Sequence, residues 1–240
     1  MPLDRSKLQF ILYVLDPEPE LFALAAVHAF GRYGYNTGDD PDASILRKCA
    51  IVGVGHDSAA YEAGPFGFNV EALRDLRRLH FRYDGIPDSR AFLEALRTDI
   101  VPHCEQSLLE LPEMLPRENR ALLGCSLSSL LALRTVLRPK NQLEPSRSRS
   151  TGGGDVFGVL VCGSPSLIFT PELINEARRV FPEKSKKEAK HPVKLLFVSG
   201  ETEARKPVDG GNGIPQAADY MAGLLRRGGH HVWRILLVHI

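Results

Sequence analysis

The sequence predicts an α/β protein, a three-layer α/β/α sandwich built on a mostly parallel sheet. Six short segments are continuous apolar runs, which is the pattern of strands buried on both faces. These runs alternate with segments whose apolar residues recur at helical spacing. The chain of 240 residues is 43% hydrophobic and 25% charged, which is ordinary for one globular domain with a sizeable core. We therefore expect residues 1–240 to form a single domain.

The predicted elements follow one another in regular alternation. The strands are expected at 8–15, 49–55, 121–123, 156–163, 193–199 and 232–238. Helices are expected at 20–32, 89–109, 127–137, 171–181 and 214–227, the second with a kink at Pro102 and the last closed by Gly228 and Gly229. The polar segment at about 140–155 is expected to be a flexible insertion, because the alternation resumes in phase after it.

Composition excludes several classes of protein. A formal net charge of +1 argues against nucleic acid or an anionic membrane as the main partner. No apolar run approaches the ~18 residues of a membrane-spanning helix, and residues 10–15 are too short an apolar run for a signal peptide. The four cysteines form no C-x-x-C pair, which favours reduced thiols and a cytoplasmic protein. Neither metal-ligand spacing nor a G-x-G-x-x-G motif is present, so we expect no cofactor.

The stretch from Gly124 to Ser128 carries the strongest chemical signal. It reads Gly-Cys-Ser-Leu-Ser and joins a predicted strand to a predicted helix, which is the layout of a nucleophile elbow, G-x-S-x-G. Ser128 stands where that motif has its last glycine. Two other interpretations remain open: Ser126 as a simple helix N-cap, or Cys125 as the nucleophile. The elbow exposes its middle residue, which favours Ser126.

A serine nucleophile needs a base and an acid that orients the base. Polar residues follow the carboxyl ends of the predicted strands, where ligands bind in such sheets. The order Ser126, then Glu201 or Glu203, then His239 is the Ser…Asp/Glu…His order of α/β-hydrolases. Asp209 competes for the acid. The alternatives are that these carboxylates are solvated loop residues and that His239 is a frayed terminal residue.

Several segments together resemble one family. The chain is similar to the esterase family of α/β-hydrolases that includes esterase D-like proteins and the ferric-enterobactin (enterochelin) esterases. The matching segments are Tyr13-Val14-Leu15-Asp16 with Y-x-L-D-G, residues 51–55 with V-G-I-G, residues 120–133 with R-x-L-x-G-H-S-L-G-G-L-x-A-L, Ser164-Pro165-Ser166-Leu167 with S-P-S-L-W-W, and residues 197–203 with the strand before the acid. They lie in the family's order and extend over most of the chain.

The resemblance implies a serine esterase with Ser126 as nucleophile and a small-molecule ester as substrate. It implies one oxyanion donor in the backbone N–H of Leu127 and a second in the loop after Asp16. Pro17 stands where the family usually has glycine and has no N–H to donate. The second donor is therefore expected at Glu18 or is missing.

The chain departs from the family pattern elsewhere as well. Cys125 replaces the usual histidine beside the nucleophile, and we expect it to lie at the substrate site with Asp16. The family has further strands before the Y-x-L-D strand and a Gly-x-x-His loop with a final helix, so we expect a hydrolase fold lacking its usual N-terminal strands. The interval to His239 is short, so the family's base need not be this residue.

Two functions follow from these observations. The first is a carboxylic-ester hydrolase, with ferric-siderophore esters suggested by the nearest branch of the resemblance. The second is a catalytically impaired hydrolase-like protein that binds a ligand or a partner. Residues Arg74, Arg77, Arg78 and Arg82 form either a solvated basic face or a recognition patch for an anionic substrate. The sequence leaves the oligomeric state open.

Overall fold

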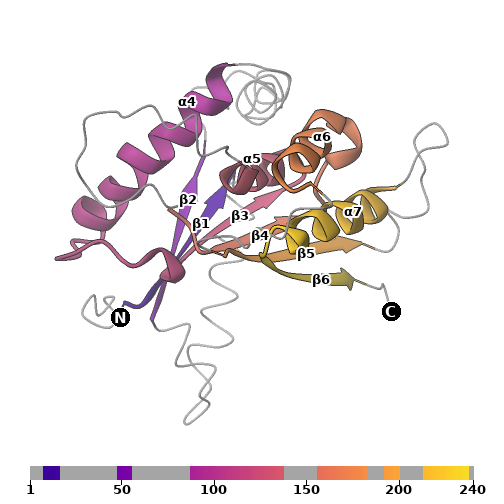
Figure 1. Cartoon of the computed structure of the whole chain (residues 1–240). Helices are drawn as coiled ribbons and strands as arrows, with labels where there is room; N and C mark the ends of the chain where they lie inside the picture. Colours follow the sequence, from indigo (N-terminus) through magenta and orange to yellow (C-terminus); the bar gives the residue numbers. More distant parts are fainter. Residues whose placement is uncertain are drawn as a thin grey trace, which may run out of the picture.

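The computed structural model describes residues 8–16, 48–55, 87–137, 156–182, 192–200 and 213–237. Within them the chain forms one parallel sheet of six strands in the order β2-β1-β3-β4-β5-β6 (Figure 1). The strands are β1 Phe10–Leu15, β2 Cys49–Val54, β3 Arg120–Cys125, β4 Val159–Gly163, β5 Lys194–Gly200 and β6 His231–Leu237. All six strands predicted from apolar runs are confirmed, with ends shifted by a few residues. In chain order, β1 is the first strand of the described residues, and the described sheet contains no strand that precedes it in the sequence.

One face of the sheet is fully buried and the other is half-buried. Tyr13 is in register with Leu122, and Leu160 with Leu195; all four side chains are at most 1% exposed. The neighbouring positions on the opposite face are only partly covered, and at the edge strand Trp233 is 52% exposed. The core therefore lies between the sheet and a single layer of described helices.

That layer consists of four helices. They are α4 Pro87–Ala95, α5 Leu127–Leu137, α6 Pro171–Val180 and α7 Ile214–Arg227, and they lie side by side on the same face of the sheet (Figure 1). The helices predicted at 127–137, 171–181 and 214–227 are confirmed. The predicted helix at 20–32 and the segment at 140–155 lie outside the described residues. No helix in the described part of the chain combines the length and apolar character needed to cross a bilayer.

The kink predicted at Pro102 takes the form of two wide turns. The segments Leu96–Ile100 and His103–Leu108 are π-helical, one on each side of the proline. The N–H of Val101 donates to the carbonyl of Leu96, five residues earlier. A proline has no N–H and its ring clashes with the carbonyl four residues back. Widening the turn moves that carbonyl aside, so the helix continues past Pro102 instead of ending there.

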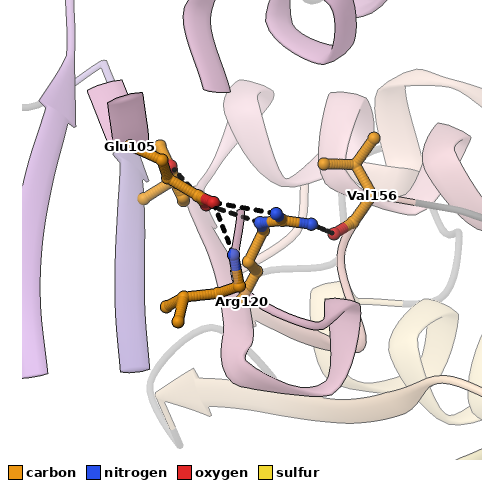
Figure 2. Close-up of polar contacts among 5 residues, drawn as sticks. Glu105, Arg120 and Val156 are labelled. Atoms are coloured by element: carbon orange, nitrogen blue, oxygen red, sulfur yellow. Dashed lines mark hydrogen bonds and ion pairs between the residues drawn. The ribbon is translucent and has the colours of Figure 1, made fainter. Parts of the chain in front are cut away.

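The second wide turn carries a charged residue into the core. Glu105 is fully buried, and its carboxylate forms a two-pronged ion pair with Arg120 at the start of β3, with Nε–Oε1 at 2.5 Å and Nη2–Oε2 at 2.8 Å (Figure 2). The same carboxylate accepts hydrogen bonds from the Tyr13 hydroxyl and the Leu115 N–H. Arg120 Nη1 donates to the Val156 carbonyl at 3.4 Å. The buried charges are therefore paired and hydrogen-bonded on several sides.

The Tyr13 hydroxyl stays protonated in this network. Burial raises the pKa of Tyr13 well above its usual range, and the negative charge of Glu105 raises it further. The neutral hydroxyl therefore remains the donor in its hydrogen bond to Glu105.

We predict that Arg120→Met costs about 3–5 kcal/mol of unfolding free energy, because it leaves the carboxylate of Glu105 buried without its cation. The double variant Glu105→Leu with Arg120→Met should recover most of that loss, since both charges are then gone. Urea unfolding measures both. Arg97→Met, which breaks the partly exposed pair with Glu94, is the control and should cost at most about 1 kcal/mol. Equal losses in Arg120→Met and Arg97→Met would contradict the assignment.

Candidate functional site

Three residues at the carboxyl edge of the sheet have left-handed backbone conformations. Asp16 follows β1 with φ 52°, Ser126 follows β3 with φ 56°, and Ser164 follows β4 with φ 41°. Each donates its N–H to a carbonyl at the end of the next strand: Val54, Gly163 and Val198, at 2.9, 2.8 and 2.7 Å. The sheet hydrogen bonds thus continue one residue past these strands. Non-glycine residues rarely adopt positive φ, so three at one edge mark it as a strained, candidate functional edge.

Ser126 occupies the corner between β3 and α5. Its positive φ differs from the extended backbone of an ordinary N-cap residue, which speaks against the simple capping interpretation. The turn depends on Gly124, because a Cβ there would lie 2.5 Å from the backbone carbon and oxygen of Ser128. The start of α5 therefore lies directly against the end of β3, as the sharp strand-to-helix turn of a nucleophile elbow requires.

Ser128 replaces the last glycine of the motif without opening this turn. Its hydroxyl accepts a hydrogen bond from the Cys125 N–H at 2.9 Å and donates to the Cys125 carbonyl at 2.8 Å. Ser129 adds hydrogen bonds from its hydroxyl to the carbonyls of Gly124 and Gly163. Both side chains are at most 1% exposed. The serine that replaces the motif's glycine thus stabilises the turn through its hydroxyl hydrogen bonds. Comparison with the motif alone shows only that a glycine is missing.

The hydroxyl of Ser126 lies 3.0 Å from the hydroxyl of Ser166, and either atom can be the donor. Ser166 also donates its N–H to the Ser126 carbonyl at 3.3 Å and accepts from the Thr170 hydroxyl at 2.9 Å through its own carbonyl. Ser166 is 5% exposed. Two hydrogen bonds thus hold the backbone of the buried Ser166, and its hydroxyl in turn fixes the side-chain direction of Ser126. Sequence reasoning quoted Ser166 only as part of a family motif; its role shows in the fold, since 40 residues separate the two serines.

The expected oxyanion donors are partly defined. Leu127 is the first residue of α5, so its N–H is among the helix amides with no carbonyl one turn earlier to bond. The N–H of Asp16 is already used by the Val54 carbonyl, so this amide is unavailable as a donor. Cys125 is exposed beside the serine, and its place at the substrate site stays a prediction. Glu18 lies outside the described residues.

The remaining candidates for the triad also lie outside the described residues. These are the acids Glu201, Glu203 and Asp209 and the base His239. The arginines at 74, 77, 78 and 82, expected as a solvated face or a recognition patch, lie outside them too. Among the described histidines, His103 is exposed on the wide turn, and His230 and His231 lie at the amino end of β6, away from the edge that carries Ser126. The described residues contain no cluster of His, Cys, Asp or Glu suited to a metal ion.

Three of the four thiols are kept in their protonated form by burial. Burial raises the pKa of Cys162 to about 12, and it also raises the pKa values of Cys49 and Cys104. None of the four cysteines, all of them described residues, is in a disulfide, and Cys125 is the exposed one. Three of the four therefore fit the expectation of buried reduced thiols, at least in part, while Cys125 does not.

Comparison with known proteins finds similarity in structure only. No family model matches the chain, and no curated protein sequence matches it. The siderophore hydrolase EstB from Aspergillus nidulans superposes with a TM-score of 0.64 at 16% identity, over 97% of this chain and 77% of that one. The enterobactin and salmochelin hydrolase IroE gives 0.55 at 17%, over 98% and 76%. An IroE-like serine hydrolase from Shewanella oneidensis gives 0.54 at 15%, over 99% and 66%.

These similarities establish the fold. The chain has the α/β-hydrolase fold of esterase-like proteins, with one parallel sheet and flanking helices. The expected α/β class with a parallel sheet is confirmed; of the three expected layers, the sheet and one helical layer lie within the described residues. Identities of 15–17% carry the fold and not the activity.

We predict that Gly124→Ala destabilises the protein by about 1–3 kcal/mol, because the added methyl group pushes α5 away from β3. The control is Gly223→Ala in α7, where an added Cβ meets no atom within 4 Å. It should be neutral or gain up to about 1 kcal/mol, since alanine is the better helix former. Urea unfolding compares the two. An unchanged unfolding free energy in Gly124→Ala would show that α5 does not lie as close to β3 as described.

Proposed function

We propose that the protein is a serine hydrolase that cleaves carboxylic esters, with Ser126 as the nucleophile. The observation that carries the proposal is the left-handed Ser126 at a strand-to-helix corner that only a glycine at position 124 permits. Such strain at a polar residue is retained where it positions a reactive group. The fold shared with solved siderophore hydrolases is consistent with it.

In the proposed reaction, the Ser126 hydroxyl attacks the ester carbonyl while a base takes its proton. The negative charge that develops on the carbonyl oxygen lies at the start of α5, where the Leu127 N–H and the helix dipole favour it. The alcohol then leaves, and water hydrolyses the acyl-serine. We assign the base to His239, with Glu201 or Glu203 as its acid, because in the sequence they follow β6 and β5, whose carboxyl ends share the edge that carries Ser126.

Ser166 is assigned a positioning role in this scheme. When it donates to Ser126, it leaves the serine proton free to point at a base. When it accepts, it holds the proton away from that base. The scheme therefore needs Ser166 as the donor in the reactive state, which its buried and anchored position allows.

The substrate class is proposed by analogy with structurally similar proteins. Two of the similar structures are siderophore or enterobactin hydrolases, and we extend this to a small-molecule ester of the siderophore type for the present chain. A comparison of a ferric siderophore ester with a short p-nitrophenyl ester as substrates tests it. Faster turnover of the p-nitrophenyl ester by several orders of magnitude would point to a simple esterase.

A second candidate is a hydrolase-like protein that binds a ligand without cleaving it. Pro17 follows the Asp16 turn and has no N–H for an oxyanion. Loss of one oxyanion donor costs about 10²–10³ in rate. Weak or absent turnover with an intact fold is the outcome that favours this candidate.

We predict that a fluorophosphonate probe labels the native protein and that labelling disappears in Ser126→Ala, because the probe needs the serine oxygen. Hydrolysis of p-nitrophenyl esters should disappear in the same variant. Ser164→Ala, at the neighbouring strand end, is the control and should still label. Mass spectrometry of the adduct identifies the modified residue. Absence of labelling in folded protein, under conditions that label a control esterase, would favour the binding module.

His239 is tested separately. His239→Ala should lower the rate of labelling and of ester hydrolysis strongly if it is the base, since an unassisted serine hydroxyl is a poor nucleophile. An unchanged rate would assign the base to another histidine while leaving Ser126 in place.

We predict that Ser166→Ala lowers kcat about threefold to tenfold and leaves KM nearly unchanged, because one hydrogen bond worth about 0.5–1.5 kcal/mol is lost at the nucleophile and not at the substrate. Thr135→Ala on α5, whose hydroxyl bonds the Ala132 carbonyl, should leave both constants unchanged. Steady-state kinetics with a p-nitrophenyl ester measures the effect. A rise in KM alone would place Ser166 in substrate binding.

A further inference from the structure

A partly open cavity of about 260 Å³ lies at the amino edge of the sheet, where β4, β5 and β6 begin. Its described lining residues are Arg117, Glu118, Gly158, Pro192, Lys194 and His231. Because all strands of the sheet are parallel, this edge is opposite to the one that carries Ser126. The cavity is therefore separate from the proposed ester site and needs its own explanation.

Positive charge predominates in the lining. Arg117 and Lys194 are cationic, His231 is a titratable group, and Glu118 supplies the opposing carboxylate. The Glu118 side chain is 70% exposed, and its Oε1 lies 3.9 Å from Arg117 Nε, so it neutralises the arginine only weakly. Lys194 is exposed and has no ion-pair partner among the described residues. The cavity thus keeps a surplus of positive charge.

The guanidinium of Arg117 has unused donors. Its side chain is 14% exposed, and its Nε and Nη1 are buried with no hydrogen-bond partner within the described part of the chain. Its one hydrogen bond to a described residue is a long one, from Nη2 to the Phe157 carbonyl at 3.5 Å. A buried charged donor without an acceptor costs more free energy than the average hydrogen bond returns. An acceptor in the cavity would remove that cost.

The backbone that carries Arg117 is held firmly in place. The Gly158 N–H donates to the carbonyl of Arg117 at 2.7 Å and to that of Arg120 at 3.2 Å. A Cβ at Gly158 would lie 2.7 Å from the Arg117 oxygen and from the Glu118 Cα, so this close approach requires glycine. The wall of the cavity is therefore fixed before any ligand arrives, which lowers the entropic cost of binding.

We propose that this cavity binds a small oxyanion, namely a phosphate group, either free or as the monoester of a small molecule. Arg117 supplies to the anion its positive charge and an N–H donor that has no partner among the described residues, and Lys194 adds a flexible point charge. The volume is below the ~300–1,000 Å³ of pockets that take drug-sized ligands, so the anion is small. The amino edge of the sheet then carries a ligand site distinct from the chemistry at its carboxyl edge.

The positive field of the cavity reaches the neighbouring core. The pKa of His230 is lowered to about 4, first by burial and then by the charges of Arg117 and His231. Nδ1 of His230 accepts a hydrogen bond from the Val193 N–H, which needs the neutral ring. An anion between Arg117 and Lys194 would offset the same field.

The test is a titration of the full chain with inorganic phosphate at constant ionic strength, against sodium chloride. Thermal unfolding and isothermal titration calorimetry are the two readouts. We expect a saturable rise in Tm and a measurable heat, because a ligand that binds only the folded state stabilises it. Arg117→Gln and Lys194→Gln should each weaken phosphate binding about tenfold to a hundredfold, the loss typical of hydrogen bonds to a charged partner.

Two controls make the result decisive. Arg179→Gln, at an exposed position of α6, removes the same charge from a residue outside the cavity lining and should bind phosphate as the native protein does. Ser126→Ala should also bind normally, which separates this site from the proposed hydrolase. Lys194→Gln changes an exposed side chain, so it remains informative if Arg117→Gln fails to fold.

One outcome overturns the proposal: a rise in Tm that does not saturate, is equal in all variants and gives no heat. Phosphate would then act only as an excluded salt, and the Arg117 donors would be satisfied by water. Repeating the titration with glycerol 3-phosphate separates the two sources. Tighter binding than inorganic phosphate indicates a phosphate monoester, and weaker binding indicates the free ion.

Discussion

The buried ion pair between Glu105 and Arg120 joins parts of the chain that are far apart in sequence. It ties the wide turn after α4 to the first residue of β3, and through Tyr13 to β1. The Val156 carbonyl brings in the segment that leads to β4. The carboxylate of Glu105 and the guanidinium of Arg120 thus hold together the central strands and the turn that follows α4 (Figure 2). Because a buried charge is costly without its partner, replacing one of the two residues alone should be strongly destabilising. The pair lies at the start of β3, and the elbow lies at the other end of the same strand.

The elements of the fold followed from the sequence because their signals are local. Apolar runs and helical spacing depend on residues close together in the chain, and they located all six strands and three of the four described helices closely. The fourth was expected to continue through Pro102, and it does so by widening its turns. Glu105 could not be assigned to the core in this way, because its burial depends on Arg120, Tyr13 and Leu115, which approach it only after folding.

The candidate site shows the same division. The corner at Ser126 was predictable, because a short glycine-containing motif between a strand and a helix specifies its own geometry. The roles of Ser128 and Ser166 were not, since one depends on hydroxyl hydrogen bonds across the turn and the other on two neighbouring strands placing their ends together. The order Ser126, Glu201 or Glu203, His239 remains a prediction, because the acid and base candidates lie outside the described residues.

The wide turns around Pro102 also control a rotational phase. An α-helix advances about 100° per residue, because 3.6 residues make one turn. Removing or adding one residue before Glu105 would therefore swing its carboxylate about a quarter-turn or more around the helix axis, away from Arg120. A five-residue hydrogen-bond register accommodates the proline and at the same time sets the angle at which Glu105 meets the sheet. The length of this helix is consequently constrained by the direction of one side chain as well as by the distance that it spans.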